Sequence, residues 1–101
     1  MFEVIEDAAR TIADNHDVNI RFIDQLEDST MVAFTTGAAE GDAIKDGEHA
    51  QVVRVHTDNG RAVVHDAVGT GDGHWDIEGE SHFLNYHDGL AAAAQKIATN
   101  Q

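Results

Sequence analysis

Residues 51–68 read QVVRVHTDNGRAVVHDAV, and this stretch decides the fold. Valine and other apolar residues alternate with polar ones on both sides of a central Asp58-Asn59-Gly60. An Asn-Gly pair between two alternating runs is a strong signal for a β-hairpin. We therefore expect strands over 51–57 and 61–68.

The register of this hairpin has two alternatives. A two-residue Asn59-Gly60 turn would pair Val55 with Val64. A three-residue loop with Gly60 in the left-handed region would pair Val55 with Val63 instead. The choice matters because a shift of one residue moves every side chain to the other face of the sheet.

Period-two alternation occurs in three more segments, where it predicts half-buried strands. In each segment the apolar side chains are expected to face the core. The segments are 18–26 with Val18, Ile20 and Phe22, 30–36 with Val32 and Phe34, and 74–80 with Trp75 and Ile77.

Apolar residues at three-and-four spacing predict a helix near each end of the chain. The first covers 3–15 and the second runs from about Phe83 to Asn100, with Ser81 as its N-cap. Because Gly89 interrupts the second helix, its alternative start is at Asp88. The glycine-rich segment 37–50 between the strands is predicted to be irregular, with a short helical turn over 43–45, and to be the most mobile part of the chain.

This order of elements predicts a single small α+β domain over 1–101. We expect a mainly antiparallel sheet of about five strands with both helices on one face. The order resembles that of roadblock-type and secretion-chaperone α+β domains, which are small dimeric binding modules. The segment 37–50 is too short and too rich in glycine for the helix that those domains place there, and no functional residue is carried over.

The charge balance constrains the partners. Nineteen acidic residues against six basic ones give a formal charge of −13. We therefore expect binding neither to nucleic acid, whose phosphates require clusters of Lys and Arg, nor to an anionic membrane surface. Salt adaptation and simple solubility also explain such acidity, although seven isoleucines are atypical of a salt-adapted chain. With no cysteine and no signal-like start, the expected location is cytoplasmic.

The seven histidines raise the question of a metal site. His74 and Asp76 are two residues apart on one predicted strand, and His65 and Asp66 lie on the strand expected beside it. Imidazole and carboxylate together can bind zinc or another divalent ion. These four residues are the candidate metal ligands, although their spacing matches no metal-binding motif, and no cofactor is otherwise expected.

The last predicted helix lacks the acidity of the rest of the chain. Residues 81–101 contain one acid, Asp88, and one base, Lys96. Because interface cores are depleted of charge, this helix is the predicted contact surface between two copies, with Leu90, Ala91 and Ala94 as its candidate residues. The competing explanation is that alanine is simply the best helix former.

These features favour a non-catalytic protein-interaction module that forms a homodimer. Catalysis is not favoured because Ser29 and Ser81, the only serines, both have structural explanations in a turn and a helix cap. Two alternatives stay open. One is a metal-dependent site at the histidines above, and the other is an acidic decoy that mimics nucleic acid for a basic protein partner.

Overall fold

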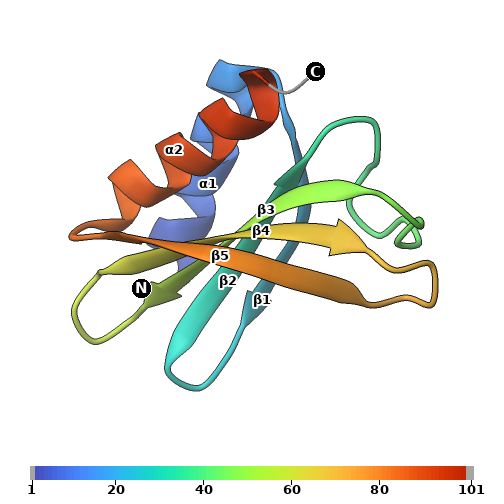
Figure 1. Cartoon of the computed structure of the whole chain (residues 1–101). Coiled ribbons are helices and arrows are strands. Elements are labelled where there is room, and N and C mark those ends of the chain that lie inside the picture. The colour runs from blue at the N-terminus through green and yellow to red at the C-terminus, as the bar shows by residue number, and fades with distance from the viewer. Residues whose placement is uncertain (1, 100–101) are drawn as a thin grey trace.

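The computed structural model describes residues 2–99, which form two helices and one five-stranded sheet (Figure 1). All neighbouring strands are antiparallel, and their order in the sheet, β1-β2-β3-β4-β5, is their order in the chain. The α+β class and the five-stranded antiparallel sheet predicted from the sequence are confirmed. The elements are α1 (Phe2–His16), β1 (Asn19–Gln25), β2 (Ser29–Thr35), β3 (His49–His56), β4 (Ala62–Gly69), β5 (Trp75–Phe83) and α2 (Tyr86–Thr99).

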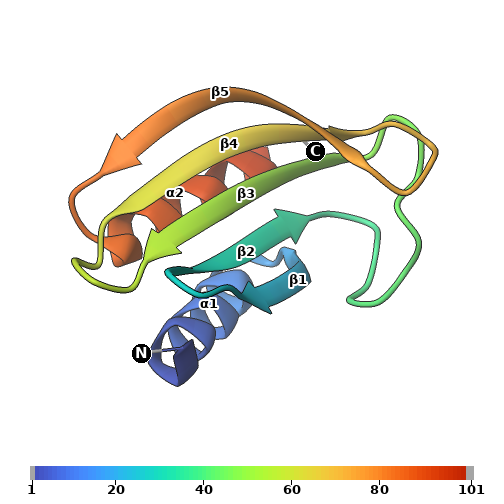
Figure 2. The ribbon, with the colours of Figure 1, turned by 90° about the horizontal axis from the view of Figure 1, so that it is seen from below.

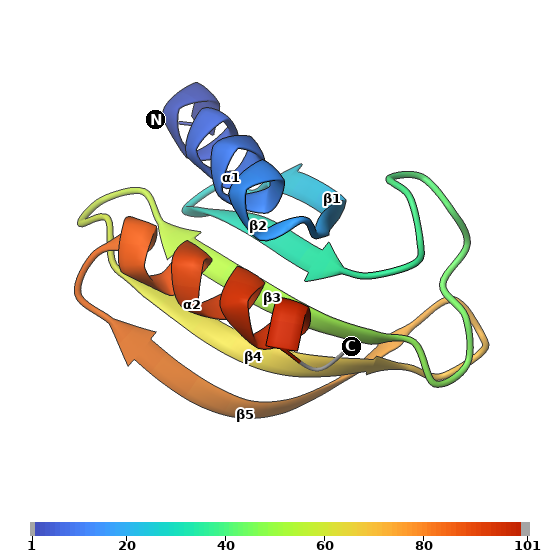
Figure 3. The same ribbon diagram turned by 90° about the horizontal axis from the view of Figure 1, so that it is seen from above.

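Both helices cover the same face of the sheet, as expected. In Figure 3 α2 lies in front of β3 and β4, and in Figure 2, seen from the other side, these strands lie in front of α2. α1 packs against β1, β2 and α2. The main core between helices and sheet centres on the fully buried side chains of Ile5, Phe34, Val53, Val55 and Leu90. Neither described helix is long and apolar enough to cross a membrane.

The alternation predicted for the first strand breaks at a β-bulge. Ile20 pairs with Phe34 and Phe22 pairs with Ala33, so Arg21 is an extra residue in β1. A bulge shifts the following side chains to the opposite face. Ile20 therefore packs in the main core, whereas Phe22 lies on the face away from the helices, and the prediction that both share one face is wrong.

The β3–β4 hairpin has a longer loop than either predicted register. Val55 pairs with Ala62, and the N–H of His56 bonds to the carbonyl of Arg61 at 2.9 Å. Four residues, 57–60, therefore form the loop, and Gly60 has the expected positive φ of 70°. The N–H of Gly60 reaches the carbonyl of His56 at 2.9 Å, which closes a wider turn than Asn-Gly alone predicts.

The second helix begins three residues later than predicted. Phe83 is still part of β5, and Asn85 is the N-cap of α2. Its side-chain oxygen accepts the N–H of Asp88 at 2.9 Å, and its amide donates to the carboxylate of Asp88 at 3.0 Å. Neither Ser81 nor Asp88 caps the helix, because Ser81 is paired with Val64 within the sheet.

Candidate functional site

The four candidate metal ligands do not converge. His65 and Asp66 are neighbours on β4, so their side chains lie on opposite faces of the sheet. Asp76 pairs with Val68 on the same face as Asp66, and His74 lies before the first residue of β5. Among residues 2–99, no group of three or more His, Asp or Glu side chains could hold a metal ion.

The three candidate interface residues on α2 are mostly inside the protein. Leu90 and Ala94 have no exposed surface because they pack against the sheet, and only Ala91 is partly exposed. At Leu90 and Ala94 the absence of charge therefore reflects burial. A second copy cannot contact Leu90 or Ala94 without opening the core.

The face of the sheet away from the helices offers a different surface, which we call the open face. Its centre is a second apolar cluster of small residues with larger side chains around them. By register, the open face is formed by Phe22, Asp24, Ser29, Met31, Ala33, Thr35, Ala50, Val52, Arg54, His56, Val63, His65, Ala67, Trp75, Ile77, Glu80 and His82. The strands that carry these side chains lie toward the viewer in Figure 2.

The open face is nearly free of negative charge, unlike the chain as a whole. The inner strands β2, β3 and β4 contain one acid, Asp66, which points to the helix-covered side. Carboxylates reach the open face only at its edges, from Asp24 on β1 and from Glu80 on β5, where Glu80 pairs with His82 at 3.0 Å. Arg54 is an exposed residue near the end of β3, the middle strand of the sheet. Its Nη2 atom lies 3.9 Å from the sulfur of Met31.

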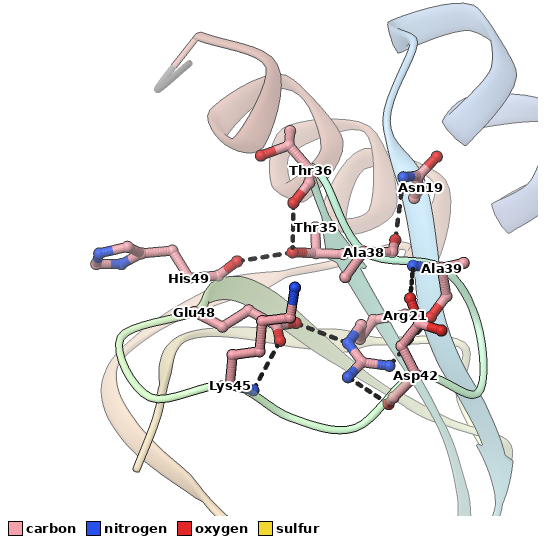
Figure 4. A network of polar contacts seen from close by, with 10 residues as sticks. All are labelled: Asn19, Arg21, Thr35, Thr36, Ala38, Ala39, Asp42, Lys45, Glu48 and His49. Atoms are coloured by element: carbon pink, nitrogen blue, oxygen red, sulfur yellow. Dashed lines mark hydrogen bonds and ion pairs between the residues drawn. The ribbon is translucent and has the colours of Figure 1, made fainter. Parts of the chain in front are cut away.

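The segment 36–48 is fastened beside this face by one buried arginine (Figure 4). The side chain of Arg21 is 3% exposed, and its Nε donates to the carboxylate of Glu48 at 2.6 Å. Its two terminal nitrogens donate to the carbonyls of Ala39 at 3.2 Å and Asp42 at 2.6 Å. The bulge in β1 is what places this guanidinium under the segment.

Further hydrogen bonds fix both ends of the same segment. The side chain of Asn19 donates to the carbonyl of Ala38 at 3.0 Å, and the N–H of Gly47 donates to the carbonyl of Gly69 at 2.9 Å. A Cβ atom at Gly69 would lie 2.1 Å from the carbonyl oxygen of Lys45, so only glycine permits this approach. The helical turn expected over 43–45 is absent, and these contacts argue against the predicted mobility.

The fastened segment forms one wall of a hollow at the end of the open face. The hollow has a volume of about 360 Å³ and brings together Phe22 from β1, Trp75 from β5 and Ile44 from the segment. Arg21, Asp24 and Asp42 also line it, and the carboxylate of Asp42 accepts the N–H of Ala39 at 2.8 Å. Aromatic faces beside carboxylates are the surroundings that a guanidinium or ammonium group prefers.

A larger cavity of about 600 Å³ lies on the helix-covered side, near the end of α2. Asp66 on its wall accepts hydrogen bonds from Gln51 and from Lys96, the latter at 2.7 Å. These hydrogen bonds, first that of Gln51 and then that of Lys96, lower the pKa of Asp66 below its usual value. Because these polar groups bind one another, the cavity does not select a class of ligand.

No protein-family model matches this chain, and neither a curated protein nor a solved structure is significantly similar to it. The site is therefore judged on its geometry. Sequence reasoning missed the open face because it counted charge along the chain. The sequence does show that the segments 29–35 and 49–57 contain no acidic residue. It does not show the strand register, which places the side chain of Asp66 on the helix-covered side of the sheet.

Proposed function

We propose that this chain is a protein-interaction module that binds a second copy of itself through the open face. The observation that carries the proposal is the combination of an apolar sheet face with a chain charge of −13 and carboxylates only at the two edges of that face. Loss of charge from the centre of a surface is the compositional mark of protein interfaces.

Partly exposed apolar side chains support this proposal. Phe22, Met31, Val63 and Trp75 are each partly exposed on the open face, and Ile77 is 50% exposed. They come from four different strands, so together they cover most of the width of the sheet. They surround a centre that is itself buried, since Ala33, Ala50, Val52 and Ala67 are at most 1% exposed. Exposed apolar side chains gathered on one face are a mark of interaction surfaces.

The size of the open face fits a modest interface. Five strands of seven to nine residues span about 550 Å² per copy at normal strand spacing. Two copies would then bury about 1,100 Å² in total, just above the roughly 1,000 Å² expected of a specific interface. We therefore expect a reversible dimer of moderate affinity.

A charge placed on the open face tests the proposal. Ile77→Asp is expected to weaken dimerisation about ten-fold or more, because the carboxylate would be buried at the interface without a partner. Leu84→Asp is the matched control. Leu84 is 79% exposed in the connection between β5 and α2, so the same change there leaves the open face intact.

Sedimentation equilibrium over a range of concentrations measures both variants, and circular dichroism checks that they are folded. The proposal is supported if the wild type and Leu84→Asp dimerise equally and Ile77→Asp does so more weakly. A wild-type chain that stays monomeric up to about 1 mM, where association is worth only about 4 kcal/mol, would overturn it.

A further inference from the structure

The hollow beside the segment 36–48 is built from parts of the chain that are far apart in the sequence. Phe22 and Asp24 are two residues apart on β1, so their side chains leave the same face of the strand. Ile44 comes from the segment, and Trp75 is the first residue of β5. The volume of about 360 Å³ lies within the range of roughly 300–1,000 Å³ that is usual for small-molecule pockets.

Gly69 brings two of the apolar side chains together. Trp75 pairs with Gly69 across the β4–β5 ladder. A Cβ atom at Gly69 would lie 2.9 Å from the Cγ2 atom of Ile44, so Ile44 occupies the space that a side chain on β4 would fill. Ile44 and Trp75 therefore meet over this glycine, and both line the hollow.

The hollow has two aromatic side chains in its lining. Phe22 and Trp75 pack against the second apolar cluster, and each stays partly exposed. Among residues 2–99 the rings that stack on one another are those of Tyr86 and His87. The rings of Phe22 and Trp75 therefore do not cover each other, and their π-electron surface can attract a cation.

The lining also has an excess of negative charge. The guanidinium of Arg21 is part of the wall, but it pairs with Glu48 at 2.6 Å and is 3% exposed (Figure 4). The other two charged groups are the exposed carboxylates of Asp24 and Asp42. That of Asp42 accepts the N–H of Ala39 at 2.8 Å, and a carboxylate has about four acceptor sites, so it keeps the capacity for a further contact.

The hydrogen bonds of Arg21 indicate which kind of cation fits. Its terminal nitrogens already donate to the carbonyls of Ala39 at 3.2 Å and Asp42 at 2.6 Å. A guanidinium or primary ammonium entering the hollow would bring several N–H donors to a wall whose nearby carbonyls are in use. A quaternary ammonium group has no N–H donor, and its methyl groups suit aromatic and apolar surfaces.

We infer that this hollow binds a small organic cation that carries a quaternary ammonium group. The carboxylates of Asp24 and Asp42 balance its charge, and the rings of Phe22 and Trp75 contact its methyl groups. Because Arg21 fastens the segment that forms the wall, the hollow exists before the ligand arrives, which lowers the entropy cost of binding. This site goes beyond the proposed dimer and does not depend on it.

Trp75 provides the measurement, because it is the single tryptophan of the chain. In dilute protein, sodium chloride is replaced stepwise by choline chloride, so that ionic strength stays constant. We expect a saturable change in tryptophan fluorescence. The neutral isostere of choline, in which carbon replaces the nitrogen, should bind at least about five-fold more weakly, because it lacks the charge.

Two outcomes of this titration overturn the inference. One is the absence of a saturable change up to about 100 mM choline, far above the concentration at which even a weak specific ligand binds. The other is equal binding of choline and its neutral isostere, which would mean that the hollow is an apolar pocket without preference for a cation.

Asp24→Asn tests the contribution of charge and keeps the size of the side chain. It is expected to weaken choline binding about three-fold or more. Asp28→Asn is the matched control, since it makes the same change in net charge at an exposed position in the connection between β1 and β2. Equal weakening by both variants would mean that choline follows the total charge of the chain, and the inference then fails.

Phe22→Leu tests the aromatic contact, because it keeps an apolar side chain of similar size. It should weaken the binding of choline about three-fold or more and leave that of the isostere unchanged. Should this variant not fold, as judged by circular dichroism, amide chemical shifts of the wild type locate the ligand. Choline is expected to shift the signals of 22–24 and 41–44 and to leave those of 86–99 unchanged. Shifts spread evenly over the whole chain would show a diffuse layer of counterions and overturn the inference.

Discussion

At the scale of single residues, the structure depends most on Arg21. Among residues 2–99 it is the one basic residue in the core, and three of its donors hold the segment 36–48 through Glu48 and two backbone carbonyls. Strand alternation predicted a solvent-facing position for it. The bulge that buries it could not be predicted, because a bulge is specified by the tertiary contacts that the extra residue makes.

Replacement of Arg21 by methionine is expected to lower the free energy of unfolding by about 3–5 kcal/mol. The reason is that Glu48, with 8% of its side chain exposed, would be left as a buried charge without a partner. The double variant Arg21→Met with Glu48→Met should recover much of this loss, because it removes both charges together. Urea denaturation followed by tryptophan fluorescence measures all three proteins.

Arg10→Met is the control for this experiment. Arg10 pairs with Glu6 at 3.2 Å, but the two side chains are 48% and 33% exposed. Such a pair contributes at most about 1 kcal/mol. If Arg21→Met and Arg10→Met cost the same, the guanidinium does not fasten the segment as described.

At the scale of elements, the sequence predicted a helix or strand best where its pattern of apolar residues alone determines the structure. Both helices and all five strands were predicted, since hydrophobic periodicity reports on burial directly. The predicted boundaries and strand registers were wrong where contacts between residues distant in the sequence determine them. The β3–β4 loop has four residues and β5 extends to Phe83, because pairing with β4 outweighs the helical pattern of residues 83–86.

The N-terminus of α2 allows a test of one such boundary. Asn85→Ala removes both the hydrogen bond to the N–H of Asp88 and the bond to its carboxylate. We expect a loss of about 1 kcal/mol in the free energy of unfolding. Asn85→Ser keeps an acceptor for the N–H and should cost only a small part of that.

Thermal unfolding followed by circular dichroism measures the two variants under the same conditions. A third variant, Ser81→Ala, distinguishes the observed cap from the one predicted by sequence. It should leave the stability of α2 unchanged, because Ser81 lies within β5. A larger loss for Ser81→Ala than for Asn85→Ala would contradict the observed boundary.

At the scale of the whole molecule, the charge opposes the association proposed above. The smallest dimension of the protein is 24 Å, so two packed copies have their centres roughly 25 Å apart. Two charges of −13 at that distance would repel by on the order of 30 kcal/mol in water without salt. The open face reduces the repulsion only locally, so dissolved ions must screen the rest.

Salt is therefore expected to strengthen the dimer. The screening length falls from about 8 Å at 0.15 M to about 3 Å at 1 M, which removes most of the remaining repulsion between the two bodies. The dimer dissociation constant should thus fall by about ten-fold or more between these two concentrations of sodium chloride.

Sedimentation equilibrium in a series of sodium chloride concentrations measures this dependence, with Ile77→Asp as the control. If salt acts through the open face, the wild type tightens and the variant remains weaker at every concentration. Association that rises equally in both proteins would point to general precipitation of an acidic chain. A dissociation constant that increases with salt would mean that attraction between opposite charges outweighs the repulsion of the two bodies, and that the charge-poor centre of the open face is not what permits contact.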